Sequence, residues 1–262
     1  MGRKALHGLI VIALTLLTQL GGIAYLLALA LPRRAFTRIV GFLAFYIWLG
    51  VLASFTAPLF DRVPLACSAN ANPVLHAQSR LYCLLNRHYV SLDTLNYAAQ
   101  LAVTVDAVHP GTRTLTLDAG FPFLDGMPLL PHLSHDDGQK LDFAFYYTDA
   151  EGNYLPGVTP SPIGYWGFED PTSGSTEPCA DSSGLSLRWN MSWLQTLMRD
   201  VQLDEDRTRT ALRWIAENPP PGGKVFVEPH LLERLGVSAP HIRFQGCRAA
   251  RHDDHFHVEI GG

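Results

Sequence analysis

Two long uncharged runs near the start of the chain constrain its fold more than any other feature. Residues 9–31 and 39–60 contain no aspartate, glutamate, lysine or arginine. A helix rises about 1.5 Å per residue, so each run is long enough to cross the roughly 30 Å hydrocarbon core of a bilayer. Neither run has the polar face that a surface helix needs. The sequence therefore predicts a two-helix transmembrane hairpin over residues 1–60.

Two other interpretations of these runs are open. The first run could be a cleaved signal peptide, with Ala28-Leu29-Ala30 as a small-residue cleavage site. Its apolar stretch is longer than the usual 7–15 residues, and the second run would remain after cleavage. Alternatively, both runs could be buried helices of a soluble core. Both alternatives fit the runs less well than membrane spans do.

The charge of the chain divides at the end of the second run. The first 60 residues hold five of the 20 basic residues and no acidic residue, which leaves 15 basic and 24 acidic residues in positions 61–262. Three of the five lie in the connector at residues 32–38. The positive-inside rule favours a cytoplasmic connector with both chain ends outside. An exported domain with a net charge of −9 is a poor nucleic-acid binder, so no nucleic-acid partner is expected.

The four cysteines all lie beyond the apolar runs, at Cys67, Cys83, Cys179 and Cys247. Their number is even and none has the C-x-x-C spacing of a metal knuckle. Both features favour disulfides in an oxidising compartment. Four cysteines allow three pairings, and the sequence does not choose among them.

Residues 61–262 mix helical and extended patterns without a regular βαβ alternation, which favours an α+β domain. Ser91 can cap a helix over residues 92–102. Other helices are expected over residues 193–201, 207–217 and 229–235, and strands over residues 112–117, 140–147, 224–228 and 255–260. Residues 152–184 are rich in Gly, Pro, Ser and Thr and are expected to form a long surface loop.

Five of the eleven histidines lie in two short clusters that also contain carboxylates. The first cluster holds His132, His135 and Asp142, and the second holds His252, His255 and His257. The last two histidines are two residues apart on a predicted strand, so their side chains share one face. Imidazole and carboxylate are ligands of catalytic zinc, which keeps one open position for water. The neighbouring acidic pairs can equally be solvated loop charge.

The spacing His135-x-x-Gly138-x-x-x-Asp142, followed by a near-terminal His255-x-His257, resembles the signature of the LAS metallopeptidases. This group includes lysostaphin-type endopeptidases, D-Ala-D-Ala peptidases and murein endopeptidases. Within it, the penicillin-insensitive murein endopeptidases also carry a histidine three positions before the first ligand and three histidines in H-x-x-H-x-H spacing. The resemblance covers residues 88–260. It implies a hedgehog/D-Ala-D-Ala peptidase-like domain over residues 61–262, built around a small antiparallel sheet.

The resemblance also implies roles for these side chains. One zinc ion would be bound by His135, Asp142 and His257, and His255 would be the catalytic base. Asp254 is the alternative base, because related dipeptidases place a glutamate three residues before the last ligand. The remaining histidines of the two clusters would hold the substrate or the oxyanion, or would support the ligands; these are His132 and His252.

The implied function is a membrane-anchored murein endopeptidase that hydrolyses amide bonds in peptidoglycan stem-peptide cross-links. Its domain would face the periplasm from the bacterial inner membrane. A D-Ala-D-Ala carboxypeptidase or dipeptidase, and a non-catalytic metal-containing binding domain, are the alternatives within the same fold. The chain also departs from the family. An arginine expected before the first motif is missing from residues 123–130, which leaves Arg113 as a candidate, and Lys140 stands where the family has a small residue.

Overall fold

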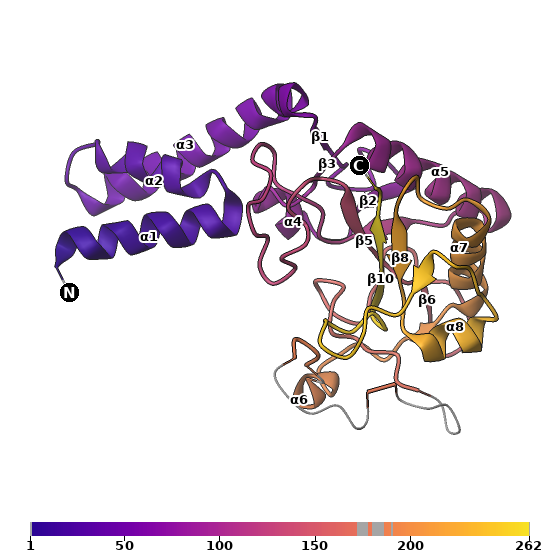
Figure 1. Ribbon diagram of the computed structural model, residues 1–262. Helices are drawn as coiled ribbons and strands as arrows, with labels where there is room; N and C mark the ends of the chain where they lie inside the picture. The colour runs from indigo at the N-terminus through magenta and orange to yellow at the C-terminus, as the bar shows by residue number, and fades with distance from the viewer. Residues whose placement is uncertain (1, 172–177, 180–185, 190, 262) are drawn as a thin grey trace.

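The computed structural model describes residues 2–171, 178–179, 186–189 and 191–261. Its fold is α+β, as expected. A group of three N-terminal helices extends from a domain that contains a six-stranded sheet (Figure 1).

The three helices of the N-terminal group are α1 (Arg3–Thr18), α2 (Gly21–Leu29) and α3 (Ala35–Thr56), and a short 3-10 turn, η1 (Ala57–Phe60), continues the last of them. The helix α2 folds back along α1, and Tyr25 reaches His7 with an oxygen-to-nitrogen distance of 2.7 Å. Figure 1 shows α3 returning along α2 toward the domain.

The predicted two-helix hairpin is wrong, because the first apolar run does not form one helix. The chain turns at Gln19, whose φ is 62°, and the Thr18 hydroxyl accepts a hydrogen bond from the Gly21 N–H at 2.8 Å. A Cβ atom on Gly22 would lie 2.9 Å from the carbonyl oxygen of Val11, so the close approach of α2 to α1 requires glycine. Within the described residues, only Ala35–Phe60 is long and apolar enough to cross a membrane.

This arrangement gathers the basic residues of the N-terminal group at one end. The start of α1 and the turn between α2 and α3 lie together, at the end of the group away from the domain (Figure 1). The Arg38 side chain closes that turn by donating to the carbonyl oxygen of Leu29 at 3.0 Å. All five basic residues of this group therefore lie at the end away from the domain. The topology expected from the sequence had placed Arg3 and Lys4 on the same side of the membrane as the domain. The positive-inside rule therefore favours an exported domain, with five basic residues on the far side of α3 against Arg62 directly after it.

The main sheet has the strand order β2-β4-β5-β10-β8-β9. Its strands are β2 (Leu75–Ala77), β4 (Thr114–Thr116), β5 (Lys140–Ala144), β10 (His255–Glu259), β8 (Lys224–Phe226) and β9 (Ile242–Arg243). The central strands are antiparallel, but β2 is parallel to β4 and β8 is parallel to β9. The sheet is therefore mixed and not the small antiparallel sheet that was expected.

The other elements flank this sheet. Two two-stranded sheets pair β1 (Val63–Pro64) with β3 (Tyr89–Val90) and β6 (Tyr147–Thr148) with β7 (Gln202–Leu203). The remaining helices are α4 (Arg80–Leu84), α5 (Leu92–Val108), α6 (Ser192–Gln195), α7 (Glu205–Glu217) and α8 (Pro229–Leu235).

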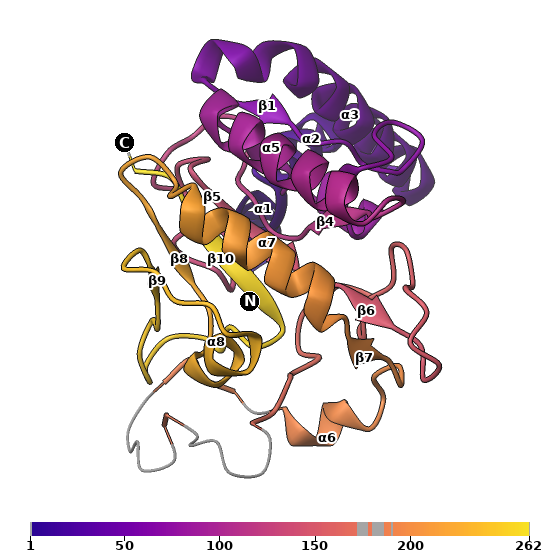
Figure 2. The same cartoon turned by 90° about the vertical axis from the view of Figure 1, so that its right-hand side faces the viewer.

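The hydrophobic core lies between the sheet and the long helices α5 and α7, which lie in front of it in Figure 2. Phe143 of β5 and Phe256 of β10 stack there with their ring centroids 5.0 Å apart. The predicted cap of α5 is present, since the Ser91 hydroxyl accepts from the Thr94 N–H at 3.2 Å. Since side chains alternate along a strand, the residues on either side of these phenylalanines face away from the core.

Several predicted elements are shorter than the sequence indicated. The strand expected over residues 140–147 ends at Ala144, and the chain then turns into β6. The helix expected over residues 193–201 is confined to α6. The described part of the long loop, residues 152–171, contains one isolated bridge from Tyr154 to Thr148 and no longer helix or strand. The rest of that loop falls largely outside the described residues.

Two disulfides are present, Cys67–Cys83 and Cys179–Cys247, which selects one of the three possible pairings. The first joins the segment after β1 to α4, and the second joins the loop before α6 to the segment before β10. Disulfides of this kind are typical of proteins in oxidising compartments outside the cytoplasm.

We predict that replacing Cys67 and Cys83 together by serine lowers the free energy of unfolding. The disulfide closes a loop of 16 residues, for which loop-closure entropy gives about 3 kcal/mol. Denaturant unfolding of the full chain in detergent micelles measures this loss. Reductant should then destabilise the variant less than the wild type, because only Cys179–Cys247 remains in the variant. A non-reducing peptide map that links Cys67 to any other cysteine would contradict the pairing.

Candidate metal centre

The register of two central strands builds the candidate centre. The strand β10 runs antiparallel to β5 with His257 opposite Asp142, so both side chains leave the same face of the sheet, away from the core phenylalanines. Asp142 Oδ1 lies 2.7 Å from His257 Nδ1. The structure brings His135 to the same point from the preceding loop, with its Nε2 atom 3.1 Å from His257 Nδ1 and 3.3 Å from Asp142 Oδ1.

These three atoms lie 2.7, 3.1 and 3.3 Å apart. Ligands of a tetrahedral zinc ion, with bonds of about 2.0–2.2 Å, are about 3.3–3.5 Å apart, so two of the three distances would have to lengthen to hold such an ion. The three side chains are buried. The outer nitrogen of His135 lies 2.9 Å from the carbonyl oxygen of Ala119, and that of His257 lies 3.4 Å from a carboxylate oxygen of Glu259. Such outer contacts orient a metal-binding imidazole and leave its other nitrogen facing inward.

A glycine turn brings the first cluster to the sheet. Gly138 has a φ of 72°, a conformation that L side chains rarely adopt. The Arg62 guanidinium also lies against it, so that a Cβ atom at this position would come within 2.5 Å of Arg62 Nε. The carbonyl oxygen of Gly138 accepts a hydrogen bond from the Ser91 N–H at 2.8 Å. The turn between His135 and Asp142 is therefore fixed from two sides, and the spacing of the motif follows from it.

The other oxygen of Asp142 holds a second set of contacts. Asp142 Oδ2 accepts a hydrogen bond from the Tyr165 hydroxyl at 2.5 Å and lies 3.0 Å from His132 Nδ1. Burial raises the pKa of Asp142, but His135, His255 and His257 lower it well below the usual range, with a smaller contribution from His132. The carboxylate is therefore ionised and shared between the candidate ligands and His132.

His132 lies between two carboxylates. Its Nδ1 atom is also 3.3 Å from Asp118 Oδ2, and Asp118 in turn accepts two hydrogen bonds from the Arg87 guanidinium, at 2.7 and 2.6 Å. Burial lowers the pKa of His132, but Asp118 and Asp142 raise it to about 10. The two carboxylates therefore favour the protonated form of His132.

The buried arginine near the centre is Arg87 and not Arg113, the candidate from sequence. Arg113 lies apart, and its N–H donates to the Tyr154 hydroxyl at 3.0 Å. Tyr165 was expected only as an aromatic side chain that could pack over a substrate groove. Its hydroxyl instead joins Asp142 to the backbone N–H of Asp118. No spacing rule connects Arg87 or Tyr165 to the histidine motifs, because their positions depend on the tertiary fold.

The two candidate bases form one pair. Asp254 Oδ1 lies 2.5 Å from His255 Nδ1, and its Oδ2 accepts from the backbone N–H of Trp166. The opposite nitrogen of His255, Nε2, lies 3.7 Å from Asp142 Oδ2. Both carboxylate oxygens of Asp254 are thus engaged, one by His255 and the other by the backbone of Trp166. His255, in contrast, directs its Nε2 atom toward the candidate ligand Asp142.

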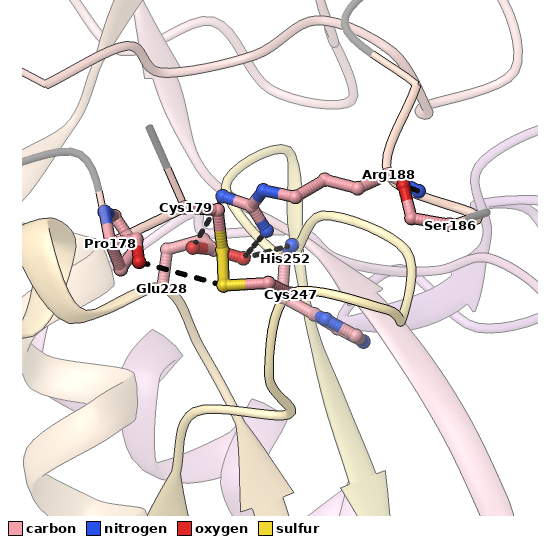
Figure 3. Close-up of a disulfide and its surroundings, with 7 residues drawn as sticks. All are labelled: Pro178, Cys179, Ser186, Arg188, Glu228, Cys247 and His252. Atoms are coloured by element: carbon pink, nitrogen blue, oxygen red, sulfur yellow. Dashed lines mark hydrogen bonds and ion pairs between the residues drawn. A yellow bond between two sulfur atoms is a disulfide. The ribbon is translucent and has the colours of Figure 1, made fainter. Parts of the chain in front are cut away.

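His252 borders the same cluster, with its ring 4.9 Å from that of His255 and 5.8 Å from that of His257. Burial, together with these two imidazoles, lowers its pKa well below the usual range. Its backbone N–H donates to Glu228, which is paired to Arg188 by two contacts of 2.8 and 2.9 Å. Figure 3 shows this ion pair beside the Cys179–Cys247 disulfide. The loop that carries His252 is therefore anchored on both sides.

The candidate centre is open to cavities. One of about 210 Å³ is lined by all three candidate ligands and by His132, His252 and His255. A second, of about 50 Å³, lies beside it, among the aromatic side chains of Tyr165, Trp166, Phe168 and Trp189. A molecule larger than water can therefore reach the cluster.

A metal site is possible at the group formed by His132, His135 and Asp142. His257 adds a fourth candidate ligand at the distances given above. A second group, formed by Cys67, Cys83 and His88, has a similar spacing. Its cysteines are joined in a disulfide and have no thiolate to offer a metal. The histidine and carboxylate cluster is therefore the better candidate.

No protein-family profile matches the chain, and no curated protein is significantly similar to it.

We predict that His135→Ala and His257→Ala each remove metal binding. Loss of an outer hydrogen-bond partner costs roughly 10–100-fold in metal affinity, and loss of a ligand should cost more. Competition with a chromophoric zinc chelator measures the affinity of the full chain. His109→Ala is the matched control, because that ring contacts Thr210 outside the cluster. Wild-type zinc affinity in either ligand variant would exclude this ligand set.

Proposed function

We propose that this chain is a membrane-anchored zinc metallopeptidase of the LAS type, similar to the penicillin-insensitive murein endopeptidases. Its reaction would be hydrolysis of amide bonds in peptidoglycan stem-peptide cross-links. The observation that carries this proposal is the convergence of His135, Asp142 and His257, with the Asp254–His255 pair beside them. An open cavity at this cluster supports catalysis over a purely structural metal site.

In the proposed reaction, His135, Asp142 and His257 would hold a zinc ion, which would supply a Lewis acid that lowers the pKa of water to about 7. His255 accepts a proton at Nε2 and later donates it to the leaving amine. Asp254, which contacts Nδ1, fixes the orientation of the ring and stabilises its charged form. His132, whose protonated form is favoured by Asp118 and Asp142, lines the same cavity, where it can stabilise the negative oxygen that develops on the attacked carbonyl.

The remaining side chains have supporting roles in this proposal. Tyr165 donates to Asp142 and so holds one carboxylate oxygen away from the substrate. His252 lies next to His255 and has a lowered pKa, so it is a neutral neighbour of the base. Both contacts restrict the rotamers of groups that must keep a fixed geometry.

The proposed location is the bacterial inner membrane, with the domain in the periplasm. Three observations support it: one apolar helix of sufficient length, two disulfides and five basic residues at the end of the helical group away from the domain. Peptidoglycan stem peptides are within reach of such a domain.

The function is tested by digestion of purified peptidoglycan fragments with the full chain in detergent micelles and zinc. The proposal expects cross-linked dimers to be converted to monomers. Release of terminal D-alanine alone would identify a carboxypeptidase or dipeptidase instead. A zinc-loaded protein that binds the fragments and leaves them intact would be the non-catalytic binding domain.

We predict that His255→Ala lowers kcat by about 10²–10⁴-fold, the usual contribution of a general base, while zinc affinity stays at the wild-type value. Asp254→Asn should lower kcat less, because it alters the orientation of the base without removing it. His109→Ala again serves as the control. The role of His255 would be excluded by a His255→Ala enzyme with wild-type kcat.

A further inference from the structure

The domain contacts α3 near the middle of the helix, at Tyr46, and not only at its C-terminal end. The Tyr46 hydroxyl donates to the carbonyl oxygen of Leu84 at 2.6 Å and accepts from the Asn86 side chain at 3.0 Å. Asn86 also donates to the carbonyl oxygen of Thr18, at the end of α1. Further along α3, Ala53 and Ala57 pack against Tyr89 of the domain. The domain therefore lies along the outer half of α3 and not beyond its end.

The depth of this contact follows from helical rise. Tyr46 lies 11 residues after Ala35, the first residue of α3, which is about 16 Å along the axis. The hydrocarbon core of a bilayer is about 30 Å thick. If α3 crosses the membrane, Leu84 and Asn86 contact it inside the thickness of the bilayer. On the same turns, α3 leaves Ile47, Trp48, Val51 and Phe55 exposed, so one flank is covered by the domain and the other is free for lipid.

The domain itself exposes leucines on this side. Leu81 and Leu84 belong to α4, which contacts α3, and their exposed fractions are 42% and 60%. Leu124, at 60%, lies between Phe123, which packs on Phe60, and Asp125, which pairs with Arg62. Leu130 and Leu133 continue the same loop up to the metal ligands and are also exposed. These five residues form what we call the leucine rim.

A cavity lies between α4 and the polar cluster beside the candidate ligands. It has a volume of about 130 Å³, and its apolar lining includes Leu81 of the leucine rim, Leu85 and Ile163. Its polar lining includes Arg87, Asp118 and His132, of which His132 contacts Asp142. The same cavity therefore offers both apolar and charged side chains, which suits an amphipathic molecule.

We infer that the leucine rim is immersed in the outer leaflet and that the site takes a peptide amide from a lipid-anchored molecule in that leaflet. The inference rests on the proposed anchoring and hydrolysis. The lipid-proximal part of the substrate lies in the cavity between Leu81 and Ile163, and the amide reaches His135, Asp142 and His257. Large exposed apolar patches on a domain mark interaction sites, and for the leucine rim the lipid tails of the outer leaflet would be the binding partner.

The immersion of the leucine rim in the bilayer can be tested without an activity assay. Cysteine is introduced at Leu84 or Leu124 in the full chain and labelled with an environment-sensitive fluorophore; the four native cysteines are in disulfides. After reconstitution in phosphatidylglycerol and phosphatidylethanolamine vesicles, emission at both positions should shift to the blue and be quenched by nitroxide-labelled lipids. Val108→Cys is the matched control, because this residue is equally exposed but lies at the end of α5 away from the helical group (Figure 1). Labels at Leu84 and Leu124 that behave like the Val108 label would overturn the inference.

The substrate class is tested in the same vesicles with one cross-linked peptide, offered free in solution or attached to a lipid. Confinement to the bilayer raises the effective concentration, so the lipid-linked form should be cleaved at least about tenfold faster. Leu81→Glu should lower this ratio, while Val108→Glu should not. Equal rates for the two forms would overturn the substrate assignment. Quenching at Leu84 and Leu124 without cleavage of either peptide would instead reject the proposed hydrolysis and leave the membrane contact standing.

Discussion

The pairing of β10 with β5 is the constraint on which the rest of the molecule depends. It sets His257 opposite Asp142 on one face and stacks Phe256 on Phe143 on the other. A slip by one residue would exchange the faces, so that buried phenylalanines would meet the cavity and imidazoles would enter the core. The apolar core therefore holds the register of the candidate metal centre, and local binding of a metal is not needed to define it.

Part of this centre could be predicted from the sequence, because it depends on local geometry. The spacing from His255 to His257 placed both rings on one face of a strand, and Gly138 allowed the turn before Asp142. The contact between the two clusters is different, since Asp142 and His257 are 115 residues apart. Their approach was inferred only through a family resemblance. Arg87 and Tyr165 belong to no motif, and their roles follow from contacts that only the fold creates.

The failure of the two-helix prediction has a similar physical cause. Hydropathy records that residues 9–31 are apolar, but it does not record where such a run bends. Gln19 is buried at the bend, where its side chain accepts from the Phe123 N–H at 2.9 Å and contacts the Met127 sulfur at 3.3 Å. These partners lie more than 100 residues away. Gln19, a polar side chain within an apolar run, is therefore one of the points at which the domain contacts the helices.

The contact of Gln19 with Phe123 also fixes the loop from Phe121 to Ser134. Gln19 and Arg62 hold its first half, through Phe123 and Asp125, and its second half leads directly into His135. Arg62 also packs against Gly138, on the other side of this ligand. The helical group is thus bonded to the segment that presents a metal ligand, in contrast to a domain on a flexible tether. Because the same contacts fix both, the position of the candidate centre relative to α3 is a property of the fold.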